Sequence, residues 1–156
     1  MTDTLAYRPL FTMHLDVAYA RARMLGDVPG GRRAVFPVDG GRFEGERLRG
    51  TVLGDGADWV TWRADGAMVI DVRLVLRTDD DALIGMHYIG LLYGRTPEAR
   101  AAMQRRETVS YEESYIRTTP RFETSDPRYE WLNRVIAVAN GHRAADGPMY
   151  QVFEIV

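Results

Sequence analysis

Short stretches in which apolar and polar residues alternate recur along most of this chain, and Gly, Asp and Pro separate them. Residues 10–17 (LFTMHLDV) show the pattern clearly, because every second residue from Phe11 to Val17 is apolar. A period of two places successive side chains on opposite faces of a β-strand. The same alternation closes the chain in residues 149–156 (MYQVFEIV). The pattern predicts a protein built mainly of antiparallel strands joined by tight turns.

We predict an all-β fold, a single antiparallel β-barrel over residues 1–156 with one short helix. The pattern gives about eight to ten strands and no repeat period, which favours a barrel, with a β-sandwich as the alternative. Glycines at 40, 41, 45 and 50 lie in strand context and indicate bends or close backbone approach. The helix is predicted over 96–107, where Thr96 can cap it and Pro97 suits its first position.

Composition excludes several classes of function. The 156 residues include 20 basic and 22 acidic side chains with no basic stripe, so we expect no nucleic-acid partner. The chain has no cysteine, which excludes disulfides and thiol catalysis and fits a cytoplasmic protein. No run of apolar residues resembles a signal peptide or a membrane span, and we expect no membrane partner.

Segment 68–90 (MVIDVRLVLRTDDDALIGMHYIG) raises one question: why are Asp71 and Arg73 set on the same side of an apolar strand? One interpretation is an exposed ion pair. The other is a ligand cavity, since pockets are mostly apolar and hold a few polar groups. In that case the apolar face of the hairpin needs a cover, and we expect a homo-oligomer.

The cavity interpretation depends on the register of the hairpin. If residues 78–81 form a four-residue loop, Asp71 lies opposite Tyr88 and Arg73 lies opposite Met86. Asp71, Arg73 and Tyr88 then share one face. A slip of one residue would move Tyr88 to the other face.

Three long blocks carry a family resemblance. Residues 40–59 (GGRFEGERLRGTVLGDGADW), 71–90 (DVRLVLRTDDDALIGMHYIG) and 115–133 (YIRTTPRFETSDPRYEWLN) together resemble the bacterial and fungal domain-of-unknown-function family 3237. The resemblance implies a calycin-like antiparallel β-barrel, often oligomeric, without a general biochemical role.

Within these blocks, five residues are candidates for catalysis and five for substrate binding. The catalytic candidates are Asp71, Tyr88, Arg73, Arg117 and Asp58, and the substrate-binding candidates are Trp59, Met86, Glu123, Trp131 and Asn133. Each has a structural alternative. Asp58 can satisfy amides in a turn, Arg117 can pair with Glu123, Trp131 can belong to the core, and Asn133 can bond a backbone turn.

His14, His87 and His142 lack the spacing of a metal site, and no serine lies in a G-x-S-x-G context. No phosphate-binding loop is present, so we expect no cofactor. The first hypothesis is a cofactor-independent lyase, hydratase or isomerase that uses acid–base chemistry on a small aromatic or carbonyl-containing metabolite in the barrel. The alternative hypotheses are a non-catalytic, lipocalin-like protein that binds a small molecule and a purely structural oligomer.

Overall fold

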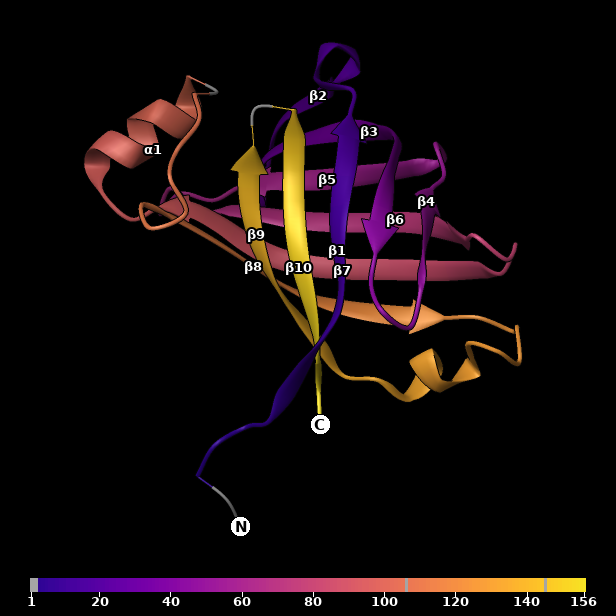
Figure 1. Ribbon diagram of the computed structural model, residues 1–156. Coiled ribbons are helices and arrows are strands. Elements are labelled where there is room, and N and C mark those ends of the chain that lie inside the picture. Colours follow the sequence, from indigo (N-terminus) through magenta and orange to yellow (C-terminus); the bar gives the residue numbers. More distant parts are fainter. Residues whose placement is uncertain (1–2, 106, 145) are drawn as a thin grey trace.

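The computed structural model describes residues 3–105, 107–144 and 146–156, and its strands form one antiparallel sheet rolled into a barrel (Figure 1). One α-helix and two short 3-10 helices, η1 and η2, interrupt the described strands. In chain order the elements are β1 (Tyr7–Val17), η1 (Tyr19–Arg21), β2 (Arg23–Val28), β3 (Gly31–Glu44), β4 (Arg49–Val52), β5 (Gly56–Trp62), β6 (Met68–Thr78), β7 (Leu83–Gly94), α1 (Pro97–Gln104), β8 (Ser114–Glu123), η2 (Glu130–Arg134), β9 (Ala137–Ala144) and β10 (Gly147–Ile155).

The barrel closes because β1 pairs with β10 on one side and with β3 on the other. From β10 the sheet continues through β9, β8, β7 and β6, and β6 pairs with β5 and β4, both of which pair with β3. A sandwich would leave its two sheets unconnected along their edges. The predicted antiparallel, calycin-like barrel is therefore confirmed, and the sandwich alternative is excluded.

Strand β3 bends so that it can serve two pairs of neighbours. Residues 31–38 pair with β2 and β5, whereas residues 41–44 pair with β1 and β4. Gly41 lies where the partners change, and a Cβ there would be 2.1 Å from the carbonyl oxygen of His14. Only glycine allows such an approach, which confirms the close backbone contact predicted for this glycine-rich stretch.

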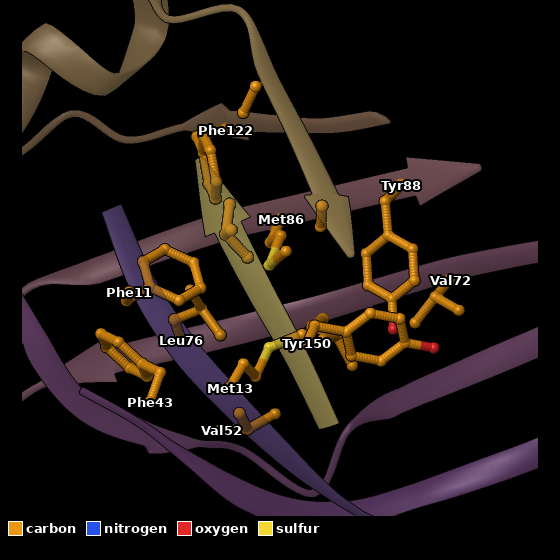
Figure 2. Packing of buried hydrophobic residues seen from close by; sticks show 14 of the residues in the cluster. Phe11, Met13, Phe43, Val52, Val72, Leu76, Met86, Tyr88, Phe122 and Tyr150 are labelled. Carbon is orange, nitrogen blue, oxygen red and sulfur yellow. The ribbon is translucent and has the colours of Figure 1, made fainter. Parts of the chain in front are cut away.

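Inward-facing side chains fill the barrel and divide it into two ends. At one end, which we call the closed end, Phe11 contacts Phe43 and Phe122 edge to face, and Leu132 of η2 is fully buried (Figure 2). At the other end β1 leads into η1 and β9 turns into β10, at the top of Figure 1. Inward-facing side chains there are only half-buried, and we call this end the mouth.

Helix α1 follows the predicted N-terminal pattern. Pro97 is the first helical residue, and the Thr96 hydroxyl accepts a hydrogen bond from the Ala99 amide at 3.1 Å. The helix ends at Gln104 and not at the predicted residue 107, and Arg106 lies outside the described residues. The helix flanks the end of β7 at Gly94, where a Cβ would be 2.4 Å from the Arg100 amide nitrogen.

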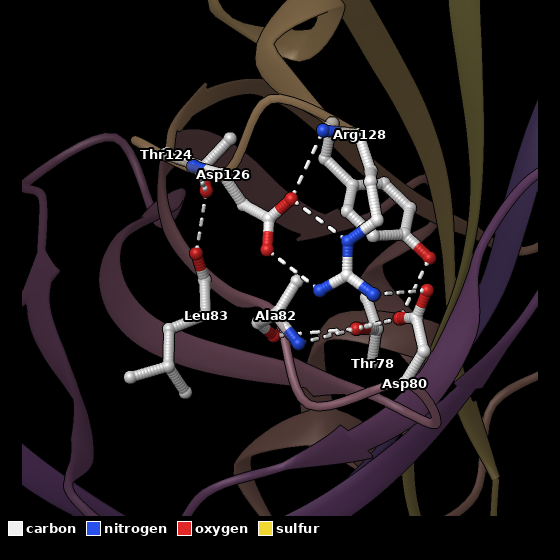
Figure 3. Close-up of polar contacts among 8 residues, drawn as sticks. Thr78, Asp80, Ala82, Leu83, Thr124, Asp126 and Arg128 are labelled. Atoms are coloured by element: carbon white, nitrogen blue, oxygen red, sulfur yellow. Dashed lines mark hydrogen bonds and ion pairs between the residues drawn. The ribbon is translucent and has the colours of Figure 1, made fainter.

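The loop between β6 and β7 sets the register of the central hairpin. The Thr78 amide donates to the Ala82 carbonyl at 3.0 Å, and the Thr78 hydroxyl accepts from the Ala82 amide at 2.8 Å. The loop is therefore residues 79–81, and Asp81 adopts the left-handed conformation at φ 67° that such three-residue loops use. An ion pair of 2.9 Å between Arg128 and Asp80 ties the loop to the segment after β8 (Figure 3).

This loop shifts the hairpin by one residue from the prediction. Asp71 lies opposite Ile89, Arg73 opposite His87, and Tyr88 opposite Val72. The prediction that Asp71, Arg73 and Tyr88 share a face is therefore wrong, because one residue of slip reverses the faces of one strand. The apolar face of the hairpin lines the barrel interior and needs no second subunit to cover it.

Candidate functional site

Three ionisable side chains converge inside the barrel, from three separate strands. Asp58 of β5 is next to Val72 of β6, which in turn is next to Tyr88 of β7, so both side chains face inward with one strand between them. Tyr150 reaches them from β10, and its ring centroid is 5.4 Å from that of Tyr88. Figure 2 shows both phenol hydroxyls directed to the same part of the interior, beside Val72. The structure thus brings together two of the predicted catalytic residues, Asp58 and Tyr88.

The Asp58 carboxyl is poorly hydrated. Its pKa is raised to about 7, chiefly by burial; a hydrogen bond from the Asp71 amide at 3.2 Å opposes the rise, and the nearby Asp71 carboxylate adds to it. The residue as a whole is only half-buried, so part of it is accessible to solvent. A carboxyl with a pKa near neutrality can both accept and release a proton under physiological conditions.

The two tyrosines have the opposite character. Burial raises the pKa of Tyr88 well above its ordinary value, and the charges of Tyr150 and Asp58 add to the rise. Burial also raises the pKa of Tyr150, again with a contribution from Asp58. Both hydroxyls are therefore protonated at neutral pH and available as hydrogen-bond donors.

The Tyr88 hydroxyl is buried and makes no hydrogen bond of ordinary length within the described part of the chain, although it interacts with the nearby Tyr150 hydroxyl. Buried hydroxyls are nearly always bonded, because leaving one unbonded costs about 1–3 kcal/mol. Gly141 of β9 helps to create this arrangement, since a Cβ there would come within 3.0 Å of the Tyr150 ring. An unbonded hydroxyl next to a poorly hydrated acid is typical of a binding or catalytic site.

Aromatic side chains and one arginine surround the mouth. The Tyr19 ring contacts the Phe36 ring at 5.9 Å, and the Phe36 ring contacts the Trp62 ring at 6.3 Å. The Arg143 guanidinium lies 5.2 Å from the centre of the Tyr19 ring. Phe36 is directly opposite Asp58 on the neighbouring strand, so this aromatic row leads to the acid.

Asp71 and Arg73 lie on the outer surface of the barrel. The Asp71 carboxylate contacts His87 Nε2 at 2.8 Å, and the two side chains are 43% and 35% exposed. Arg73 is exposed and joins no ion pair between described residues. The outward direction agrees with the interpretation that placed this pair in solvent, although the partner of Asp71 is His87 and not Arg73.

Other predicted residues also lie away from the interior acid. Arg117 faces outward, stacks on Tyr115 and donates to the Tyr111 hydroxyl at 3.0 Å, so the alternative of a pair with Glu123 is wrong. Trp59 is 46% exposed on the outer surface. Met86 is buried in the core between the two ends.

The last three predicted residues lie near η2. Glu123 and Asn133 line an open surface groove together with Gly85 and Phe122. The Asn133 side chain bonds both the amide and the carbonyl of Thr124, at 2.8 and 2.9 Å, which confirms its structural alternative. Trp131 packs against the core below the guanidinium of Arg47, at 4.1 Å.

Sequence reasoning missed Tyr150, Arg143 and the aromatic row. The alternation of residues 149–156 does place Tyr150, Val152 and Glu154 on one face, but it does not say which face is inside. That knowledge requires the pairing of β10 with β1 and β9, which joins the two ends of the chain. Long-range pairing leaves no local signal in the sequence.

Within residues 3–105, 107–144 and 146–156, no group of three or more His, Cys, Asp and Glu side chains lies close enough to hold a metal ion. No helix in these residues is long and apolar enough to span a membrane.

Comparison with known proteins confirms the resemblance predicted from the sequence. The profile of the family described as "Protein of unknown function (DUF3237)" matches residues 5–155. A UPF0311 protein, RPA1785 from Rhodopseudomonas palustris, is 31% identical over the full length of both chains. Its crystal structure superposes with a TM-score of 0.90 at 29% identity, covering 99% of this chain and 100% of that one.

Two further crystal structures share the barrel. A β-barrel-like protein from Acinetobacter baumannii AYE is 32% identical, with a TM-score of 0.85, and covers 100% of this chain and 99% of its own. A protein from Penicillium herquei, described as an enzyme, has a TM-score of 0.74 at 21% identity, over 100% of this chain and 98% of its own. At that identity the similarity shows the fold alone.

Proposed function

This chain belongs to the DUF3237 family of proteins of unknown function, and we propose that it is a cofactor-independent enzyme of acid–base chemistry. Its substrate is a small carbonyl-containing or aromatic compound that enters through the mouth. The observation that supports this function is the convergence of Asp58, Tyr88 and Tyr150 in the interior, where the Tyr88 hydroxyl is buried and forms no hydrogen bond of ordinary length with a described residue.

Each of the three residues has a role that its environment suits. The Asp58 carboxylate removes a proton from a carbon next to the substrate carbonyl. A tyrosine hydroxyl donates a hydrogen bond to the carbonyl oxygen, where the negative charge of the enolate develops. Tyr88 and Tyr150 both keep their protons at neutral pH, so either hydroxyl can be this donor. Arg73 and Arg117, which the sequence predicted as catalytic residues, face outward and have no role in this proposal.

The enolate can then react in three ways. Return of the proton from Asp58 to another carbon gives an isomerase. Loss of a leaving group from the adjacent carbon gives a lyase, and the reverse addition of water gives a hydratase. All three reactions share the same first proton transfer, which the pKa of Asp58 near 7 favours at neutral pH.

The first step can be tested before the natural substrate is known. Small aryl ketones, β-diketones and unsaturated lactones are incubated with the protein in D₂O, and proton NMR follows exchange of the hydrogens next to the carbonyl. We expect Asp58→Asn to slow exchange by about 10²–10⁴-fold, the range of a lost general base. Tyr88→Phe should slow it as well, since it removes only the hydroxyl.

The matched control is Asp71→Asn, the same substitution on the outer surface, which should leave exchange unchanged. If Asp71→Asn and Asp58→Asn slow exchange equally, the interior acid is not the base. Compounds that bind without any exchange would favour the alternative, a non-catalytic barrel that binds small molecules.

We also propose that the protein forms a homo-oligomer, through the outer surface of the sheet. Ile89 and Leu91 of β7 and Val138 of β9 are 48%, 37% and 39% exposed. Exposed apolar side chains on the same outer face of a sheet are typical of contact surfaces between subunits. Sedimentation equilibrium at micromolar concentration should show a dimer or a larger species, and a monomer would contradict the proposal.

A further inference from the structure

Arg143 faces the mouth without a carboxylate partner. It lies on β9 in the same inward-facing series as Ala137, Ala139 and Gly141, and it is half-buried. Its guanidinium forms no ion pair or hydrogen bond with another described residue. Among these residues it makes one cation–π contact, with the face of the Tyr19 ring. A partly desolvated guanidinium usually pairs with an anion, because its fork of donors matches carboxylate oxygens.

Arg143 lies between a row of aromatic rings and the ionisable side chains of the interior. Tyr19 supports the guanidinium and continues through Phe36 to Trp62. On the other side lies Tyr150, close enough that the Arg143 and Asp58 charges both act on its hydroxyl. Arg143 is not among the groups that perturb Asp58 itself, so the guanidinium does not serve as the counter-ion of that acid.

We propose that Arg143 binds an anionic group of the substrate, and that the substrates are small planar acids, that is, aromatic or unsaturated carbonyl compounds bearing a carboxylate. This inference rests on the proposed function and names its substrate class. The carboxylate lies at Arg143, the planar body lies along the aromatic row, and the reacting carbonyl points to Tyr88 and Tyr150.

Charge balance also supports an anion at this position. The Asp58 carboxylate in the interior repels an anionic substrate, and an arginine on the opposite side of the mouth offsets that repulsion. A neutral substrate would leave the guanidinium partly desolvated and unpaired in the complex, which costs free energy. The site therefore discriminates against the neutral analogue of its ligand.

Binding of matched probes tests this inference without any turnover. The probes are trans-cinnamate with cinnamamide and benzoate with benzamide, titrated by calorimetry and by ligand-observed NMR up to about 10 mM, where even weak ligands are detected. The wild-type protein should bind each acid at least about tenfold more tightly than its amide, as expected for a charge-assisted contact. Arg143→Gln should reduce that preference to about twofold or less, and Arg143→Lys should keep part of it.

Two controls separate this inference from the proposed function. Arg73→Gln removes the same charge from the outer surface and should leave the preference intact. Asp58→Asn should keep the preference even if it abolishes exchange in D₂O, so that loss of catalysis and loss of anion binding are read separately. Thermal unfolding checks that each variant folds.

The inference is overturned if the wild-type protein binds acid and amide equally, if neither acid binds, or if Arg73→Gln lowers the preference as much as Arg143→Gln does. If the preference for acids holds while no variant affects exchange, the anion site stands and the assignment of Asp58 as base fails.

Discussion

The two ends of the barrel differ in whether their polar side chains are paired. At the closed end Glu154 pairs with both Arg8 and Arg47, and Arg47 also covers the ring of Trp131. At the mouth, by contrast, the Tyr88 hydroxyl makes no hydrogen bond of ordinary length, and the Arg143 guanidinium makes no ion pair or hydrogen bond with another described residue. Paired polar groups stabilise a fold, whereas unpaired ones lower stability and are retained where a ligand completes them. From this contrast we expect the closed end to contribute more of the stability, and we propose that the mouth holds the functional site.

The largest effect should come from the closed end. Phe43 is fully buried and contacts Phe11 at a ring distance of 5.4 Å. Phe43→Ala should lower the free energy of unfolding by about 3–5 kcal/mol, through lost burial and the cavity left behind. Urea unfolding at pH 7 measures this loss. A loss below about 1 kcal/mol would contradict the comparison of the two ends, because packing at the closed end would then contribute little to stability.

The second effect is a pH dependence that arises at the mouth. Asp58 has a pKa of about 7 in the folded protein and 3.8 as its ordinary value, so the folded state binds more protons between these values. Stability should therefore fall as pH rises from about 4 to 7, by up to about 4 kcal/mol from this group. Urea unfolding across this range should show the decline in the wild type and its absence in Asp58→Asn.

Asp71→Asn is the control for this decline of stability with pH, because it removes a nearby carboxylate that lies on the outer surface of the barrel. It should retain the decline. If the stability of the wild type does not change between pH 4 and 7, Asp58 is well hydrated. The polar groups at the mouth would then not differ from those at the closed end.

The third effect has the opposite sign and arises at the closed end. Hydrogen bonds from Arg8 and Arg47 hold the pKa of Glu154 below its ordinary value of 4.5. Its contribution to stability is therefore present above pH 4.5 and is lost as pH falls below that value. Because Arg8 is half exposed, we expect Glu154→Gln to cost only about 1 kcal/mol at pH 7. The variant should also show a shallower loss of stability in acid than the wild type.

The sequence predicted the class of fold because the period of two is a local property. The strands at 10–17 and 149–156 and the cap of α1 at Thr96 all depend on neighbouring residues, and all are present. The inward position of Asp58 was not fixed by these signals, although the residue itself was a candidate.

The prediction of the site was wrong because of the length of one loop, between β6 and β7. Whether three or four residues connect β6 and β7 depends on the left-handed conformation of Asp81 and on Arg128, which reaches the loop from far along the chain. Asp81 is not a glycine, so the sequence carries no strong signal for a positive φ. One residue of slip then separated Tyr88 from Asp71 and exchanged the inner and outer faces.

The smallest effect answers the question that Asp71 and Arg73 raise. Both lie on the outer surface, and Asp71 contacts a half-exposed His87 rather than an arginine. Asp71→Asn should change the free energy of unfolding by about 0.5 kcal/mol or less, because exposed pairs contribute little. It should leave D₂O exchange and the preference for acids unchanged.

Asp71 and Asp58 allow a direct comparison, because the two acids lie diagonally across from each other on β6 and β5. The Asp71 amide donates to the Asp58 carboxylate, yet the Asp71 side chain points to solvent while that of Asp58 points inward. The same Asp→Asn change, made on the two faces of one sheet, should therefore abolish proton transfer in one case and leave it unaltered in the other. If Asp71→Asn lowers exchange by a hundredfold while its melting temperature stays at the wild-type value, catalysis occurs on the outer face at the Asp71–His87 pair, and the interior cluster is part of the core.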